Sequence, residues 1–211
     1  MTLFDRLILL VTGLVAIYLI VHFYRKYRQA DGKAKYNLYY LVAFAVLLVA
    51  GLLLIALGYD ILANPLVVIV SSFIPALLAT GLVAQFYPRS ERAFLIFAIL
   101  GVLGIALTRL GGEPGGLATV ILATVHSIFG LTIFFLPIIA TRKGEVTSFF
   151  PWVTVGGTLI SIGGIALAFL KAGMPILSQE MILTILAPLL LLMAISYALG
   201  FVKGNASPKK T

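Results

Sequence analysis

Seven long stretches of this chain contain no charged residue, and they limit what the chain can fold into. They are 16 to 28 residues long and together hold 161 of the 211 residues. In order they are Leu7–Tyr24, Tyr36–Tyr59, Ile61–Pro88, Ala93–Thr108, Pro114–Thr141, Val146–Leu170 and Met181–Val202. A helix rises about 1.5 Å per residue and needs roughly 20 apolar residues to cross about 30 Å of hydrocarbon. The sequence therefore predicts an all-α polytopic membrane protein with a bundle of seven transmembrane helices.

Composition excludes the other classes of protein. The chain is 62% hydrophobic and 10% charged, whereas soluble domains are roughly half apolar and a quarter charged. A soluble enzyme, a fibrous protein and a disordered tail are excluded, because so few charges cannot cover a surface that faces water. We expect one domain over residues 1–203 and a tail over 204–211. The expected helices cover residues 3–24, 37–58, 62–87, 93–110, 117–141, 149–170 and 180–202.

The cations are divided unequally between the two sets of loops. Twelve of the 15 lysines and arginines lie in one set, and only Arg6, Arg109 and Lys171 lie in the other. Because short cytoplasmic loops are enriched in cations, the N-terminus is predicted to lie outside and the C-terminus in the cytoplasm. The membrane is then a plasma or inner membrane. This topology explains the net charge of +8, so the predicted partner is the lipid bilayer and no nucleic acid is expected.

Aromatic residues gather where the predicted helices meet the cytoplasmic face. Amphipathic rings favour that interface, so these residues are interpreted as an interfacial belt: Phe23, Tyr24, Tyr27, Tyr36, Tyr39, Tyr40, Phe86, Tyr87, Phe149, Phe150 and Trp152.

Small residues form a stripe on the sixth helix: Gly157, Ser161, Gly164 and Ala168. Small side chains let helix backbones approach closely in lipid, so this stripe is predicted to be a packing seam. The alternative is a homodimer interface.

A weak internal repeat relates the two ends of the chain. Aligning Gly13 with Gly130 also places Arg25 on Arg142 and Lys26 on Lys143. Helices one to three and five to seven would then form two parallel triplets joined by the fourth helix, a 3+1+3 pseudo-repeat.

Prolines interrupt three helices at Pro75, Pro137 and Pro188. A proline removes a backbone donor and kinks a helix, and kinks with nearby hydroxyls can line a substrate path. Nearby hydroxyls can equally repair the interrupted hydrogen bonds. The predicted substrate-binding residues are Ser71, Ser72, Thr124, His126, Ser127 and Ser196.

The two histidines are the only imidazoles in the chain. His126 lies deep in a span, where it could contact a haem or quinone, handle a proton or bond a neighbouring helix. His22 and His126 differ in expected depth by about 15 Å, so one haem bound by both is not expected. With no cysteine and no carboxylate in the middle of a span, neither a metal site nor an ion-driven pump is predicted.

One cation, Arg109, lies close to the outer end of the short fourth span. An ion pair with Glu113, Glu180 or Asp60 at the outer face is predicted, with an extracellular binding site as the alternative. No catalytic motif occurs in the sequence, so enzyme activity is not favoured.

Two known families share this architecture. Seven helices with an outside N-terminus resemble the microbial rhodopsins, but Met181–Val202 contains no lysine for a Schiff base, so no retinal is expected. The 3+1+3 scheme is similar to SWEET-type sugar transporters, whose prolines in the first two helices of each triplet are missing from the first two helices here.

Three functions remain. The first is a transporter or permease for a neutral or weakly polar solute. The second is an accessory or scaffold subunit of a respiratory or photosynthetic membrane complex, in contact with a pigment or quinone. The third is a lipid- or quinone-modifying enzyme that uses His126.

Overall fold

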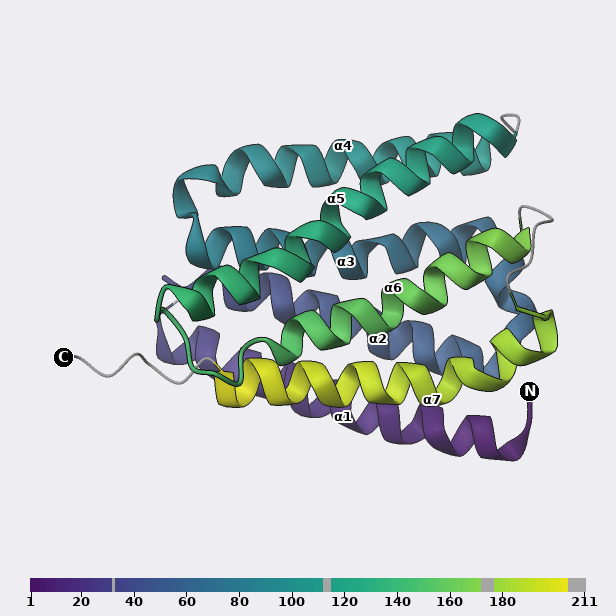
Figure 1. Ribbon diagram of the computed structural model, residues 1–211, viewed down its shortest axis with the longest axis horizontal. Helices are drawn as coiled ribbons and strands as arrows, with labels where there is room; N and C mark the ends of the chain where they lie inside the picture. Colours follow the sequence, from purple (N-terminus) through teal and green to yellow (C-terminus); the bar gives the residue numbers. More distant parts are fainter. Residues whose placement is uncertain (32, 112–114, 172–176, 205–211) are drawn as a thin grey trace.

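The computed structural model describes residues 1–31, 33–111, 115–171 and 177–204, and those ranges contain seven α-helices (Figure 1). They are α1 (Leu3–Gln29), α2 (Tyr36–Leu57), α3 (Pro65–Phe86), α4 (Glu91–Leu110), α5 (Gly115–Arg142), α6 (Trp152–Lys171) and α7 (Gln179–Ala198). Two short 3₁₀ helices, η1 (Tyr59–Ala63) and η2 (Pro88–Ser90), precede α3 and α4, and a π-helical turn, η3 (Leu199–Lys203), continues α7. The prediction of an all-α chain with seven helices is confirmed.

Six of the described helices are long and apolar enough to span a bilayer. The described apolar part of α6, Trp152–Ala166, is shorter. The chain is thus a multi-pass integral membrane protein whose apolar sides contact lipid. We name the two ends of the bundle after the predicted orientation: the outer end carries the N-terminus, and the inner end carries η2 and η3.

Local signals fix where the helices begin and end. Thr2 and Asp5 form a reciprocal capping box at the start of α1, and Ser178 caps α7 in a similar way. The side chain of Asn64 accepts a hydrogen bond from the first turn of α3, so this helix begins at Pro65 rather than at 62. α1 continues to Gln29, beyond the expected residue 24, because its last residues are polar but still favour helix.

Contacts between the described helices close six of them into a ring and leave α4 outside it. Figure 1 shows α4 along the upper edge of the bundle. α1 packs against α2 and α7, α3 packs against α2 and α5, and α6 packs against α5 and α7. α4 packs on α3 and α5 from the outside. In this order, α1 lies opposite α5, α2 opposite α6, and α3 opposite α7.

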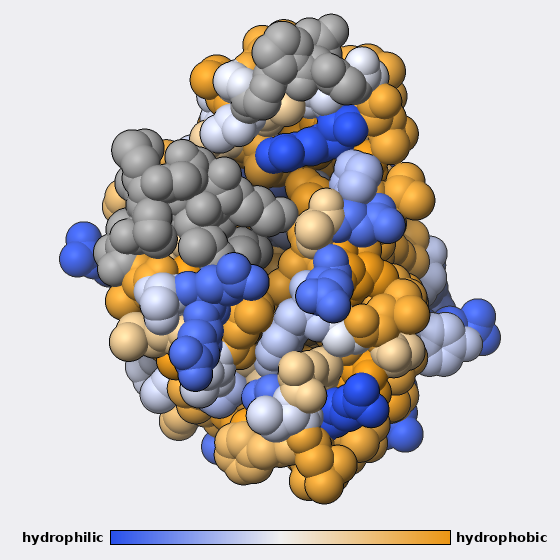
Figure 2. Space-filling view, turned by 90° about the vertical axis from the view of Figure 1, so that its right-hand side faces the viewer, coloured by the Kyte–Doolittle hydropathy of each residue, from blue (hydrophilic) through white to orange (hydrophobic). Residues whose placement is uncertain are grey.

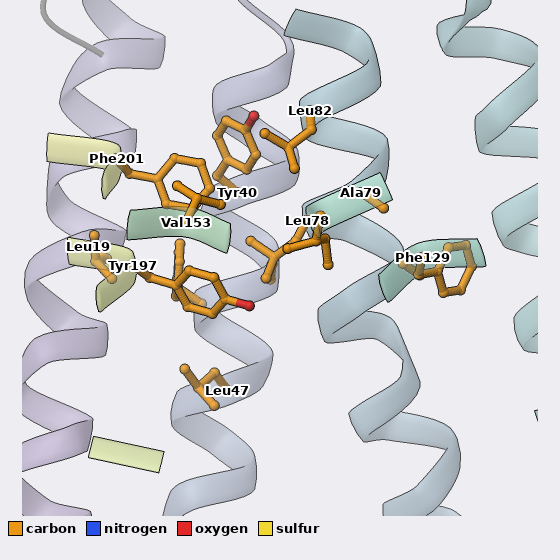
Figure 3. Packing of buried hydrophobic residues seen from close by; sticks show 14 of the residues in the cluster. Leu19, Tyr40, Leu47, Leu78, Ala79, Leu82, Phe129, Val153, Tyr197 and Phe201 are labelled. Atoms are coloured by element: carbon orange, nitrogen blue, oxygen red, sulfur yellow. The ribbon is translucent and has the colours of Figure 1, made fainter. Parts of the chain in front are cut away.

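The core is concentrated at the inner end of the ring. Figure 3 shows Phe201 of η3 beside Tyr40 of α2 and Val153 of α6, with Tyr197 and Leu78 nearby. A second, smaller buried cluster lies toward the outer end and consists of Leu9, Leu54, Tyr59 and Ala187. Figure 2, which looks onto the outer end, shows hydrophilic side chains scattered between hydrophobic ones.

Candidate functional site

An aromatic cluster closes the inner end of the ring. Phe201 is fully buried and contacts five other rings, with centroid distances of 4.6–6.0 Å. These rings belong to Phe23, Tyr40, Phe44, Phe150 and Tyr197. The interpretation of the inner aromatics as an interfacial belt is therefore wrong for Phe23, Tyr40 and Phe150, whose side chains have no exposed surface.

Two glycines allow η3 to enter this cluster. A Cβ atom on Gly200 would lie 2.6 Å from the backbone nitrogen of Val153, and one on Gly204 would lie 2.7 Å from Cα of Phe150. Real side chains do not come so close to a backbone. The loop before α6 and the end of α7 can therefore meet only because both positions are glycine.

Hydrogen bonds between helices reinforce the inner end. The hydroxyl of Tyr40 donates to Oε1 of Gln85 at 2.9 Å, which joins α2 to α3. The hydroxyl of Tyr39 donates to Oε1 of Glu91 at 2.8 Å, which joins α2 to α4. Nζ of Lys143, after α5, donates to the hydroxyl of Tyr87 at 3.2 Å, and this bond raises the pKa of Lys143.

The burial of α3 changes along its length. Every position from 76 to 84 is buried except Leu77. In the outer half, from 65 to 75, only Ser72 is buried. α3 is more deeply buried toward the inner end, and in its outer half most positions are half-buried or exposed.

The seam between α5 and α6 shows the same change along its length. A Cβ on Gly157 would lie 2.7 Å from Ile133, so the two helices are in close contact there. One turn outward, a Cβ on Gly130 would lie 3.9 Å from Oγ of Ser161. A Cβ on Gly164, the next position outward on α6, would meet nothing within 4 Å. The predicted packing seam on α6 therefore exists in its inner half and is open at Gly164.

His126 lies at the level of this opening. It is one turn outward from Gly130 on α5, so the register places His126 and Gly164 at matching depths. The imidazole is half-buried, and its Nδ1 lies 3.2 Å from the carbonyl oxygen of Leu122. Counted along α5, His126 is about 16 Å from the outer end of the helix. Ser127 and Ser161 are exposed beside the opening.

The remaining predicted path residues do not all gather here. Ser71 and Ser72 both donate to the carbonyl oxygen of Val68 on their own helix, at 3.1 and 2.7 Å. Ser196 donates to the carbonyl of Leu192 at 2.7 Å. It lies about 25 Å along α7 from the outer end, near the aromatic cluster and away from His126. Thr124 is exposed on α5.

The structure describes only some of the residues of the predicted outer-face ion pair. Within the described residues Arg109 forms no ion pair with Glu180, and its buried Nε has no hydrogen-bond partner there. Glu113 lies outside the described residues. The part of the chain that the structure describes also contains no group of three His, Asp or Glu residues arranged to hold a metal ion.

No known protein family, curated protein or solved structure matches this chain. Its function therefore has to be argued from its own residues and their arrangement.

Proposed function

We propose that this multi-pass membrane protein is a permease for a small neutral or weakly polar solute, resident in a plasma or inner membrane. In the arrangement described above it is closed toward the inside by the aromatic cluster and spread toward the outside. The solute enters beside Gly164, between α5 and α6, and then passes between the two three-helix units, α1–α3 and α5–α7. The burial of α3 carries this proposal, because its inner half is buried and its outer half is mostly half-buried or exposed.

The order of helices in the ring supports two matched units. Transporters are often built from repeats related by an axis along the membrane normal, with the substrate site where the repeats meet. In this ring each helix of the first triplet lies opposite its counterpart in the second. α4, which joins the triplets, stays outside the ring. This is the arrangement that the 3+1+3 interpretation expects.

Polar groups near mid-depth give a solute something to bind. By register, His126 and Ser127 on α5 and Ser161 on α6 lie within about one turn of the depth of Gly164, and none of them is charged. A polar group at this depth is costly unless it faces protein or water. Uncharged donors and acceptors suit a neutral solute better than an ion, which would require a compensating charge.

Solute entry into liposomes tests the proposal. Purified protein is reconstituted into liposomes, and entry of glycerol, urea and a hexose is followed by light scattering after an osmotic shift. We expect the wild type to accelerate entry of at least one probe over empty liposomes. Gly164→Leu should reduce that rate at least fivefold by filling the opening. Gly51→Leu is the matched control, because a Cβ on Gly51 of α2 also meets nothing within 4 Å.

Two results would contradict the proposal. If the wild type accelerates none of the three probes, transport of small neutral solutes is refuted. If Gly51→Leu and Gly164→Leu slow entry equally, the solute does not use the opening between α5 and α6. His126→Leu keeps the size of the side chain but removes its nitrogen atoms, and it is expected to lower the rate without loss of folded protein.

The accessory-subunit function is supported by the position of α4. This helix lies outside the ring and exposes a row of large apolar side chains, each at least half exposed: Ile96, Ile99, Leu100, Leu103, Leu107 and Leu110. Such a face can contact a partner helix as well as lipid. Purification in a mild detergent tests it: a stoichiometric partner that is lost when Leu100 and Leu103 are both changed to Trp would favour a subunit. A lone protein with transport activity would refute it. An absorption spectrum of the same sample reports any bound haem or pigment.

A further inference from the structure

A hollow of about 440 Å³ lies on α1 at the inner end of the bundle. The described residues that line it are Tyr18, Val21, His22, Arg25, Lys26 and Gln29. Positions 18, 22, 25 and 29 are separated by four, three and four residues, so they form one face of the helix. Its volume falls within the range of about 300–1,000 Å³ that is typical of small-molecule sites.

The polar groups in this hollow are two cations, an imidazole, an amide and the hydroxyl of Tyr18. Arg25 and Lys26 are exposed cations, and Gln29 adds an amide. Nε2 of His22 is buried and has no hydrogen-bond partner among the described residues. Its ring is held against Phe23 and Tyr18, at centroid distances of 5.3 and 6.5 Å. The described residues of the lining include no carboxylate. This donor set matches the oxygens of a phosphate group, which form short, strong hydrogen bonds with cationic side chains.

The depth of the hollow identifies the source of the phosphate. The charge-free part of α1 ends at Tyr24, and the cations follow at once, so the hollow crosses the boundary between hydrocarbon and headgroups. Toward mid-membrane, the helix continues with exposed apolar side chains, among them Val11, Leu14, Ile17 and Val21. A molecule with a phosphate and an acyl chain would place its charged group against the cations and its apolar chain along this row of apolar side chains.

We propose that this hollow binds the headgroup of one anionic phospholipid from the inner leaflet. The phosphate lies against Arg25 and Lys26, beside the ring of His22, and an acyl chain lies along Leu14 and Ile17. A zwitterionic lipid is disfavoured, because its ammonium group would lie close to Arg25 and Lys26. The site is separate from the opening at Gly164, so it does not depend on the proposed transport function.

Lipid binding to the full-length protein tests the proposal. The protein in detergent is titrated with phosphatidylglycerol or phosphatidylcholine, and native mass spectrometry counts the lipids that remain bound. The wild type should retain one phosphatidylglycerol more tightly than any phosphatidylcholine. A cation beside an anionic lipid strengthens binding about fivefold, so R25Q/K26Q should weaken retention of that lipid about 25-fold. R89Q/R92Q is the matched control, because it removes the same charge from exposed residues at the same end.

The second variant and a competitor complete the test. Gln29→Glu introduces an exposed carboxylate of nearly the same shape, and it should weaken phosphatidylglycerol binding while the thermal midpoint stays unchanged. Inorganic phosphate should not displace the lipid at equal concentration, because it lacks the acyl chain. Equal losses in R25Q/K26Q and R89Q/R92Q would overturn the proposal, since general surface charge would then explain binding. Displacement by equimolar phosphate would also overturn it in favour of a soluble anion.

Discussion

Gly81 of α3 lies in the tightly packed inner end of the ring. The change in the free energy of unfolding caused by Gly81→Ala measures how tightly that end is packed. A Cβ at position 81 would lie 2.5 Å from Cε1 and 2.8 Å from Cδ1 of Tyr40. The ring of Tyr40 cannot move away freely, because it is fully buried and in contact with Phe23 and Phe201. Its hydroxyl also donates to Gln85. Gly51→Ala, in the interior of α2, adds the same methyl group in open space.

The expected energies follow from these contacts. Alanine is favoured over glycine in a helix interior by about 1 kcal/mol, which applies to both variants. Forcing a methyl group into a packed core costs about 1–3 kcal/mol, and a weakened Tyr40–Gln85 hydrogen bond costs about 1 kcal/mol more. Gly51→Ala should therefore raise the free energy of unfolding by about 1 kcal/mol. Gly81→Ala should lower it by about 1–3 kcal/mol.

Reversible unfolding of both variants in mixed micelles, followed by circular dichroism, measures the difference. The two variants are expected to differ by about 2–4 kcal/mol, since the helix preference is common to both. If they agree within about 0.5 kcal/mol, Tyr40 does not pack against α3. The closed inner end would then be refuted, together with the function that depends on it.

Three further predictions concern other parts of the chain. Phe201→Ala should destabilise the protein by about 3 kcal/mol, which is the lower end of the range for a buried Phe, because the unfolded chain in a micelle still keeps the ring out of water. Thermal denaturation in detergent measures this loss, and an unchanged midpoint would contradict the packing of the aromatic cluster. Burial, and then the charge of Asp5, raise the pKa of Tyr59 to about 12, so its contribution to stability is complete below pH 10 and is lost as the pH rises through 12. Phenolate absorbance of the wild type minus Tyr59→Phe reports this pKa, and Asp5→Asn should lower it; a value near 10 would refute the burial of the phenol. Because the chain has no cysteine, Arg28→Cys and Glu180→Cys each give a protein with a single thiol. A membrane-impermeant maleimide added to intact cells should label position 180 but not position 28. The opposite labelling would show that the predicted orientation is inverted.

The helices could be predicted from the sequence because moving a charge into hydrocarbon is costly. The charges at Arg25, Asp60 and Arg89 therefore mark ends of spans without any knowledge of packing. The inner aromatics were harder to place. Tyr39 and Tyr40 are adjacent in the sequence, yet Tyr39 bonds Glu91 while Tyr40 is fully buried. Which of two neighbours faces the core depends on the rotation of α2 about its axis, and a helix that is apolar on every side gives no periodic signal for that rotation.

The candidate site was predicted only in part for a related reason. The prediction of His126 and of the stripe on α6 rests on residue type and spacing, and counting along both helices from the Gly157–Ile133 contact brings His126 and Gly164 to similar depths. The sequence predicts Ser71, Ser72 and Ser196 as path residues, but each hydroxyl donates to a carbonyl of its own helix. Their energetic need for a partner is thus met locally. The hollow on α1 was missed, although the spacing of Tyr18, His22, Arg25 and Gln29 already places them on one face.

The position of α4 has a consequence for how the two halves of the polypeptide meet. Three crossings carry the chain from one side of the bilayer to the other. A second set of three that followed directly would begin on that far side, and its helices would run antiparallel to those of the first set. One extra crossing returns the chain to its starting side, so α5 enters in the same direction as α1. α4 lies outside the ring, and its main effect is to set the direction in which α5 crosses the bilayer. An even number of connecting helices would have left the two halves antiparallel instead of parallel.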